Sequence, residues 1–132
     1  MSALSVFNIA GRAMSAQLVR LNTVASNLAN AGSIAGSEAT AYSPLKPVFA
    51  TSYAGSLATV DVERIASGMA PPERRHDPAH PLADAQGHVW VASVDTNQEL
   101  VEMTETARQY ANNVEVMATA KSLILDTLRM GK

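Results

Sequence analysis

The sequence predicts a mixed fold, mainly α with a small amount of β. Long N- and C-terminal helices pair as a coiled coil, and a small antiparallel β or irregular region lies between them. Apolar residues recur at alternating spacings of three and four at both ends, whereas the middle holds all six prolines and five of the seven glycines. We therefore divide the 132 residues into a terminal helical assembly region, 1–35 with 96–132, and a middle region, 36–95.

The first helix is predicted over residues 4–30. Its large apolar residues follow the spacing of a coiled-coil seam for more than three heptads. Ser2 is suited to cap the start of this helix, and Gly32 stands where a helix C-terminus favours glycine. The seam positions are Leu4, Phe7, Gly11, Met14, Leu18, Leu21, Ala25 and Leu28.

The last helix is predicted over residues 97–130, with the same spacing. Thr96 and Glu99 match the T-x-x-E capping box, although Asp95 could also cap this helix. Acidic residues are frequent in the first turns and basic residues near the end, as the helix dipole favours. The seam positions are Leu100, Met103, Ala107, Tyr110, Val114, Met117, Lys121, Ile124 and Leu128.

Two segments of the middle region alternate apolar and polar residues as strands do, 58–65 and 87–94. The chain between them, 67–87, is rich in proline and is predicted as a loop with a turn at 85–87. We expect the two strands to form the small antiparallel element.

Two paired helices cannot cover all of their own apolar surface, because each carries further apolar residues beside its seam. The excess predicts either burial between subunits or a β region that folds back over the helices. On the first interpretation, the assembly interface consists of Leu4, Phe7, Met14, Leu18, Leu21, Asn27, Leu28, Met103, Tyr110, Val114, Met117, Ile124 and Leu128.

Composition argues against several classes of function. The formal net charge of −2 gives no general attraction to nucleic acid or to an anionic membrane. No apolar run approaches the ~20 residues of a membrane span, so we expect no direct membrane insertion. The first charge is Arg12, which departs from the order of a cleaved signal peptide. The chain has no cysteine and no catalytic motif, and we expect no enzyme activity and no cofactor.

A cluster of histidine and aspartate is the one candidate metal site. These residue types suit zinc, but Pro78 and Pro81 prevent a helix from presenting them on one face. We therefore expect a surface loop and no metal site. The cluster consists of His76, Asp77, His80, Asp84 and His88.

Two segments of the sequence resemble a known family. Residues 20–33, RLNTVASNLANAGS, resemble the N-terminal motif of the rod, hook and hook-associated axial proteins of the bacterial flagellum. Residues 77–128, from DPAHPLADAQGHVW to KSLILDTL, are similar to the C-terminal part of proximal-rod subunits of the flagellar basal body. The sequence departs from the family pattern at His88, where the family has tyrosine, and at residues 93–96, SVDT in place of PNVN.

The resemblance implies a structural subunit of the periplasmic rod, part of the drive shaft. It implies that terminal helices pack with other rod proteins and with copies of the same chain. Rod-base and MS-ring components are further implied partners. Family members leave the cell through the flagellar type III export apparatus without a cleaved signal peptide. The alternative is a soluble coiled-coil adaptor or chaperone-like binding protein, which would form a closed oligomer.

Overall fold

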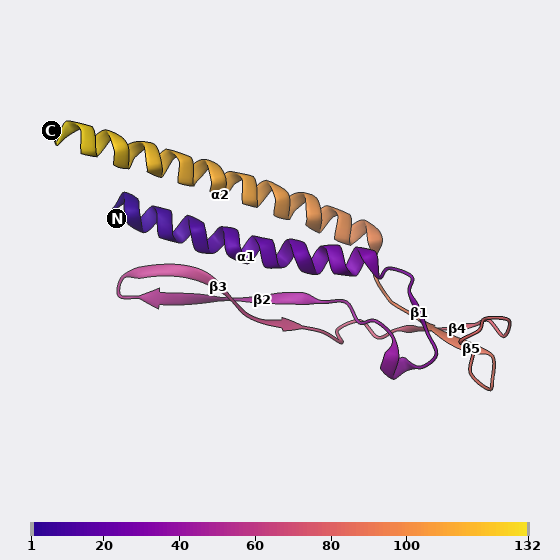
Figure 1. Ribbon diagram of the computed structural model, residues 1–132. Coiled ribbons are helices and arrows are strands. Elements are labelled where there is room, and N and C mark those ends of the chain that lie inside the picture. The colour runs from indigo at the N-terminus through magenta and orange to yellow at the C-terminus, as the bar shows by residue number, and fades with distance from the viewer. Residues whose placement is uncertain (1, 132) are drawn as a thin grey trace. The chain divides into compact units, whose positions relative to one another are not determined.

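The structure is a computed structural model that describes residues 2–131. It confirms the expected mixture of two long terminal helices and a small antiparallel middle (Figure 1). In chain order the elements are helix α1 (Ala3–Ala29), strand β1 (Ile34–Ala35), the short 3-10 helix η1 (Glu38–Thr40), strands β2 (Lys46–Ala54), β3 (Leu57–Ala66), β4 (Glu73–His76) and β5 (His88–Val91), and helix α2 (Thr96–Met130).

The chain forms two compact units, and both long helices contribute to each. The helix–hairpin unit comprises the described parts of residues 1–21, 47–64 and 104–132. It contains most of both helices and the hairpin formed by β2 and β3. The sheet unit comprises residues 22–46 and 65–103, with the three-stranded sheet and the adjoining ends of the helices.

The predicted start and end signals of α1 are confirmed. The Ser2 hydroxyl accepts the N–H of Ser5 at 3.2 Å, which satisfies one of the free donors of the first turn. After the helix ends at Ala29, Gly32 adopts a φ of 74°, a left-handed conformation that strongly favours glycine.

The predicted capping box of α2 is wrong by one residue. Asp95 is the N-cap, because its Oδ1 accepts the N–H groups of Asn97 and Gln98, both at 3.1 Å. Thr96 is already the first helical residue and its side chain is exposed. A carboxylate at this position also interacts favourably with the helix dipole, which explains why aspartate takes precedence over the neighbouring threonine.

Both predicted strands exist, but they do not pair with each other. Residues 58–65 lie in β3, which pairs with β2, a strand that the sequence analysis missed. Residues 87–94 contain the shorter β5, which lies between β1 and β4 in an antiparallel sheet. β4 falls within the predicted loop, so that part of the loop prediction was wrong. Its burial is low along its whole length, which removes the alternation of apolar residues that would have revealed it.

The sheet unit is organised around β5. Val89 is fully buried, and Trp90 lies opposite Ala35 on β1 and Arg74 on β4. The predicted turn before β5 is confirmed by Gly87, whose φ is 76° and whose Cβ, if present, would lie 2.9 Å from the Cβ of Pro78. The backbone N–H of His88, donating to Asp84 at 2.9 Å, is the main cause that lowers the pKa of that carboxyl.

Candidate assembly surface

The two long helices of the helix–hairpin unit run antiparallel (Figure 1). The Gln17 side chain on α1 donates to Oε1 of Gln109 on α2 at 2.8 Å. A guanidinium nitrogen of Arg20 also donates to this Oε1, at 3.4 Å. These contacts fix the register of the pair at one level.

Small side chains fill the interior of this unit. The fully or almost fully buried helical residues are Ala10, Ala16, Thr106 and Ala120, each at most 3% exposed. None of them occupies a predicted seam position. The sequence analysis followed the large apolar residues and so missed these small residues, which the chain buries against itself.

The large apolar side chains of this unit point outward instead. Leu4 is 70% exposed, Leu128 64% and Met130 82%. Exposed leucine and methionine gain nothing from water, so many of them on one helix pair indicate an interaction surface, here on more than one side of α2. We call this set the assembly face: Leu4, Phe7, Leu18, Val114, Val116, Leu123, Leu125, Leu128 and Met130.

A shallow apolar groove of about 350 Å³ lies between α1 and α2 within the same unit. Ala3 and Val6 on α1 face Val116, Ala120 and Leu123 on α2 across it. Beyond Leu123, α2 continues past the first turn of α1 (Figure 1). The end of α2 therefore offers its apolar residues without cover from α1.

The predicted interface residues fall into three groups. Leu4, Phe7, Leu18, Val114 and Leu128 are exposed and belong to the assembly face. Asn27 is fully buried and is treated below. The remaining residues are half-buried and border both neighbours and solvent: Met14, Leu21, Leu28, Met103, Tyr110, Met117 and Ile124.

Asn27 joins α1 to the segment around Leu45 in the sheet unit, and we call this set of hydrogen bonds the Asn27 clasp. Its amide nitrogen donates to the Leu45 carbonyl at 2.9 Å, and its Oδ1 accepts the Leu45 N–H at 2.8 Å. The Tyr42 hydroxyl donates to the same Oδ1 at 2.8 Å. With 1% of its surface exposed, Asn27 is enclosed by the chain itself, unlike the other predicted interface residues, and its place in an interface stays a prediction.

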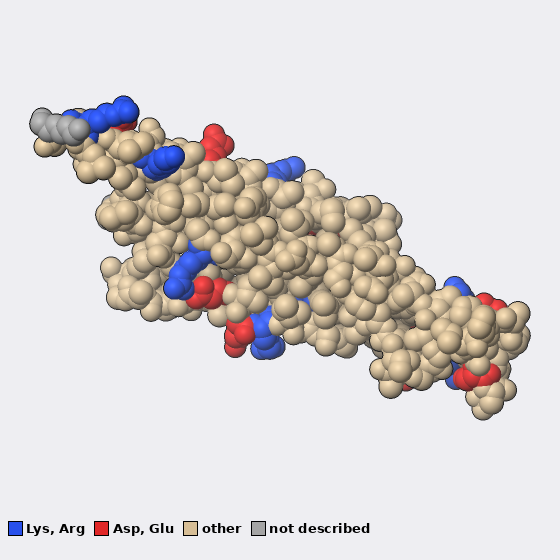
Figure 2. All heavy atoms as spheres, viewed as in Figure 1, with Lys and Arg blue, Asp and Glu red and all other residues tan. Residues whose placement is uncertain are grey.

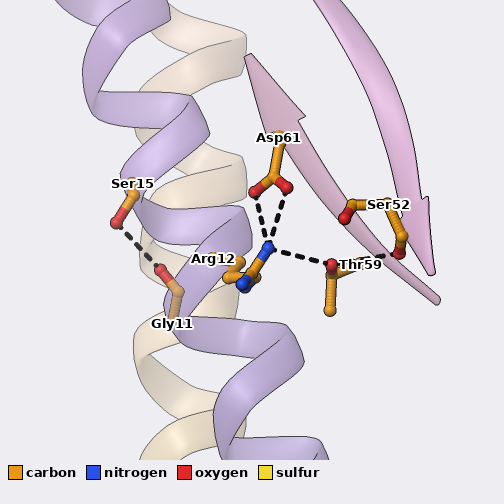
Figure 3. Close-up of polar contacts among 6 residues, drawn as sticks. All are labelled: Gly11, Arg12, Ser15, Ser52, Thr59 and Asp61. Carbon is orange, nitrogen blue, oxygen red and sulfur yellow. Dashed lines mark hydrogen bonds and ion pairs between the residues drawn. The ribbon is translucent and has the colours of Figure 1, made fainter. Parts of the chain in front are cut away.

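The β2–β3 hairpin is held against α1 by a polar contact (Figure 3). The Arg12 guanidinium bonds both carboxylate oxygens of Asp61, at 2.8 and 3.1 Å, and reaches Thr59 Oγ1 at 3.4 Å. Thr59, which is buried, donates in turn to the Ser52 carbonyl at 3.2 Å. Part of the middle region therefore does fold back over α1, yet the assembly face stays exposed.

Charge and metal-ligand chemistry have little part in this surface. Figure 2 shows lysine, arginine, aspartate and glutamate scattered over the visible face, with wide uncharged areas between them. His76 and His88 stack edge to face with ring centroids 5.1 Å apart, while His80 Nδ1 accepts the Leu82 N–H. Residues 2–131 contain no group of three or more acidic or histidine side chains arranged to hold a metal ion.

No helix in the described chain has the length and apolar character that a membrane crossing requires.

Comparison with known proteins places this surface in context. Residues 7–32 match the family described as "Flagella basal body rod protein", and residues 85–130 match "Flagellar basal body rod FlgEFG protein C-terminal". The chain is 42% identical to the flagellar basal-body rod protein FlgC of Escherichia coli O157:H7 and of Yersinia enterocolitica. It is 41% identical to that of Salmonella typhimurium strain LT2. Each alignment spans 134 residues and covers all of both chains.

The chain therefore belongs to the FlgC family of flagellar basal-body rod proteins, as its resemblance to rod subunits indicated. This family is structural and not enzymatic.

Proposed function

We propose that the protein is a structural subunit of the proximal rod of the flagellar basal body, and that it polymerises through its assembly face. One observation carries the proposal: the helical residues that the helix–hairpin unit buries almost completely are alanine and threonine, whereas several large apolar side chains, Leu128 and Met130 among them, are exposed. Burying this outer surface contributes ~25 cal/mol per Å² of apolar area removed from water. Neighbouring subunits of the rod are the surfaces that can supply the burial.

Contact in the rod is of the heterologous, head-to-tail kind, because such contacts continue indefinitely and build tubes. The helical segments 1–35 and 96–132 are the assembly region, in which the apolar seams of neighbouring helices pair as coiled coils. The middle, 36–95, forms a smaller outer part. The partners are other rod proteins and copies of the same chain. Rod-base and MS-ring components are further partners. Export without a cleaved signal peptide, through the flagellar type III apparatus, delivers the subunit to the periplasm.

A charge placed on the assembly face tests the proposal. Leu128→Asp should lower the amount of the subunit in purified basal bodies by about tenfold or more, because it removes apolar burial and adds a charge that must lose water. The measurement is quantitative mass spectrometry of basal bodies from the source bacterium, deleted for the gene and carrying the variant. Swimming in soft agar gives an independent readout.

Ser122→Asp is the matched control, since it adds the same charge at an exposed polar position of the same helix. It should assemble like the wild type. Equal incorporation of both variants into basal bodies would contradict the proposal that the assembly face is an interface between subunits. A wild-type chain that never enters basal bodies, and forms a small closed oligomer in solution, would favour the adaptor alternative.

A further inference from the structure

Glu99 is a buried acidic residue whose carboxylate has no partner among the described residues of the chain. It lies in the first turn of α2, within the sheet unit, and only 8% of its surface is exposed. Its backbone N–H donates to the Asp95 carbonyl at 3.0 Å. No hydrogen bond or ion pair joins its carboxylate to any residue between 2 and 131.

The Glu99 side chain lines a pocket of about 360 Å³ in the same unit. Asp95, Ser93 and Gln98 add oxygen atoms to its wall, and Met69 supplies an apolar side. Lys46 lines the pocket as well, but no ion pair joins its amino group to Glu99 or Asp95. The lining is thus mixed: two carboxylates, one amino group and further polar groups stand beside apolar side chains.

A carboxylate that has lost most of its water is unfavourable unless a cation or hydrogen-bond donors replace that water. Asp95 cannot compensate, since it is acidic too and its Oδ1 already accepts two backbone N–H groups. The carboxylate oxygens are not among the fully enclosed, unbonded side-chain atoms of residues 2–131, so they keep access to the open pocket, where a cation from outside the chain can reach them.

We propose that this pocket receives a lysine or arginine side chain from a neighbouring subunit of the rod. The inference rests on the proposed function. The methylene stem of such a side chain would pack on Met69 while its charged end bonds Glu99. A side chain on a docked protein fits better than a free ligand, because Leu100 and Val101, next to Glu99, are 49% and 68% exposed and offer apolar contact beside the pocket.

Three substitutions in the full chain test the pocket, each in the source bacterium deleted for the gene. Glu99→Gln keeps the shape and removes the charge, and should lower the subunit content of basal bodies by about tenfold or more. The thermal midpoint of the purified subunit should stay the same or rise, because the variant buries no charge. Glu63→Gln, at an exposed strand position, should leave both measurements unchanged.

Lys46→Met distinguishes a neighbour's cation from an internal one. Incorporation of Lys46→Met should match the wild type if the neighbour supplies the cation. Loss of incorporation equal to that of Glu99→Gln would mean that Lys46 is the partner, which overturns the proposal. So would normal incorporation of Glu99→Gln, a lowered thermal midpoint of that variant, or rods that lose this subunit on treatment with EDTA. If the wild-type chain itself fails to enter basal bodies, the proposed function fails and the pocket with it.

Discussion

The two units of the molecule differ in what they bury. In the sheet unit, Val89 and the bonded side chain of Asn27 are enclosed completely by the chain itself. In the helix–hairpin unit, the fully buried residues of the helices are alanine and threonine, and large apolar residues such as Leu4, Leu128 and Met130 are exposed. Met69 and Val101 of the sheet unit are exposed too, but the sheet unit also encloses large side chains completely. The helices of the helix–hairpin unit enclose only small side chains completely and leave more large apolar residues available to other molecules.

Among the substitutions that test this difference between the two units, the loss of the Asn27 hydrogen bonds should lower stability the most. Asn27→Ala removes three hydrogen bonds and leaves the Leu45 backbone groups without their partner. We expect the free energy of unfolding to fall by roughly 2–5 kcal/mol, because orphaned buried polar groups are costly. Urea unfolding measures this loss, and hydrogen exchange should locate it in residues 22–46.

Asn30→Ala is the matched control, since Asn30 directly follows α1 and its side chain donates to the Ser26 carbonyl one turn earlier. It should cost about 1 kcal/mol or less. An equal loss of unfolding free energy in the two variants would show that the Asn27 hydrogen bonds do not stabilise the sheet unit more than an ordinary side-chain contact does.

An intermediate effect is expected at the small interior of the helix–hairpin unit. Ala120→Leu inserts a large side chain where Ala120 is 3% exposed, and should cost about 1–3 kcal/mol by overpacking. Ala118→Leu, two residues earlier and exposed, should change stability by less than about 0.5 kcal/mol. Thermal unfolding of both variants measures this difference in stability. If Ala120→Leu is tolerated as well as Ala118→Leu, the helices are not closely packed there.

The smallest effect concerns the start of α2. Asp95→Ala should lower the free energy of unfolding by about 0.5–2 kcal/mol, because two N–H groups lose their acceptor. Thr96→Ala should stay within about 0.5 kcal/mol, since this exposed residue is not the cap. The reverse order, measured by urea unfolding, would restore the capping box predicted from the sequence.

Periodicity was a good guide to the elements and a poor one to their contacts. It placed both helices within a residue of their observed bounds, because long amphipathic patterns and end signals are local properties. It missed β1, which has two residues, and β4, which is exposed along its whole length. It also missed β2, whose half-buried positions include the small residues Ala50 and Ser52 while the aromatic Phe49 and Tyr53 are exposed. Strand pairing depends on where the chain returns in space, so no local pattern could have assigned β3 to β2.

The same distinction between local patterns and distant contacts holds for the assembly face and the Glu99 pocket. The sequence identified an apolar excess and several residues of the assembly face, because a count of large apolar residues needs no coordinates. It placed Asn27 on that face. The hydrogen bonds between Asn27 and the Leu45 backbone could not be predicted from the sequence, because the two residues are far apart along the chain. The sequence analysis assigned Glu99 to the capping box and did not find the pocket that Glu99 lines, because Lys46 and Met69, which also line that pocket, are far away in sequence.

The Asn27 clasp has a consequence for how freely this family can change. Asn27 bonds the N–H and carbonyl of Leu45, which every amino acid except proline provides, and makes no hydrogen bond to the Leu45 side chain. The clasp itself therefore places no demand on the identity of residue 45. A substitution of Leu45 by any residue other than proline leaves both of these hydrogen bonds available. A single asparagine on the helix thus permits sequence drift in the segment that it holds.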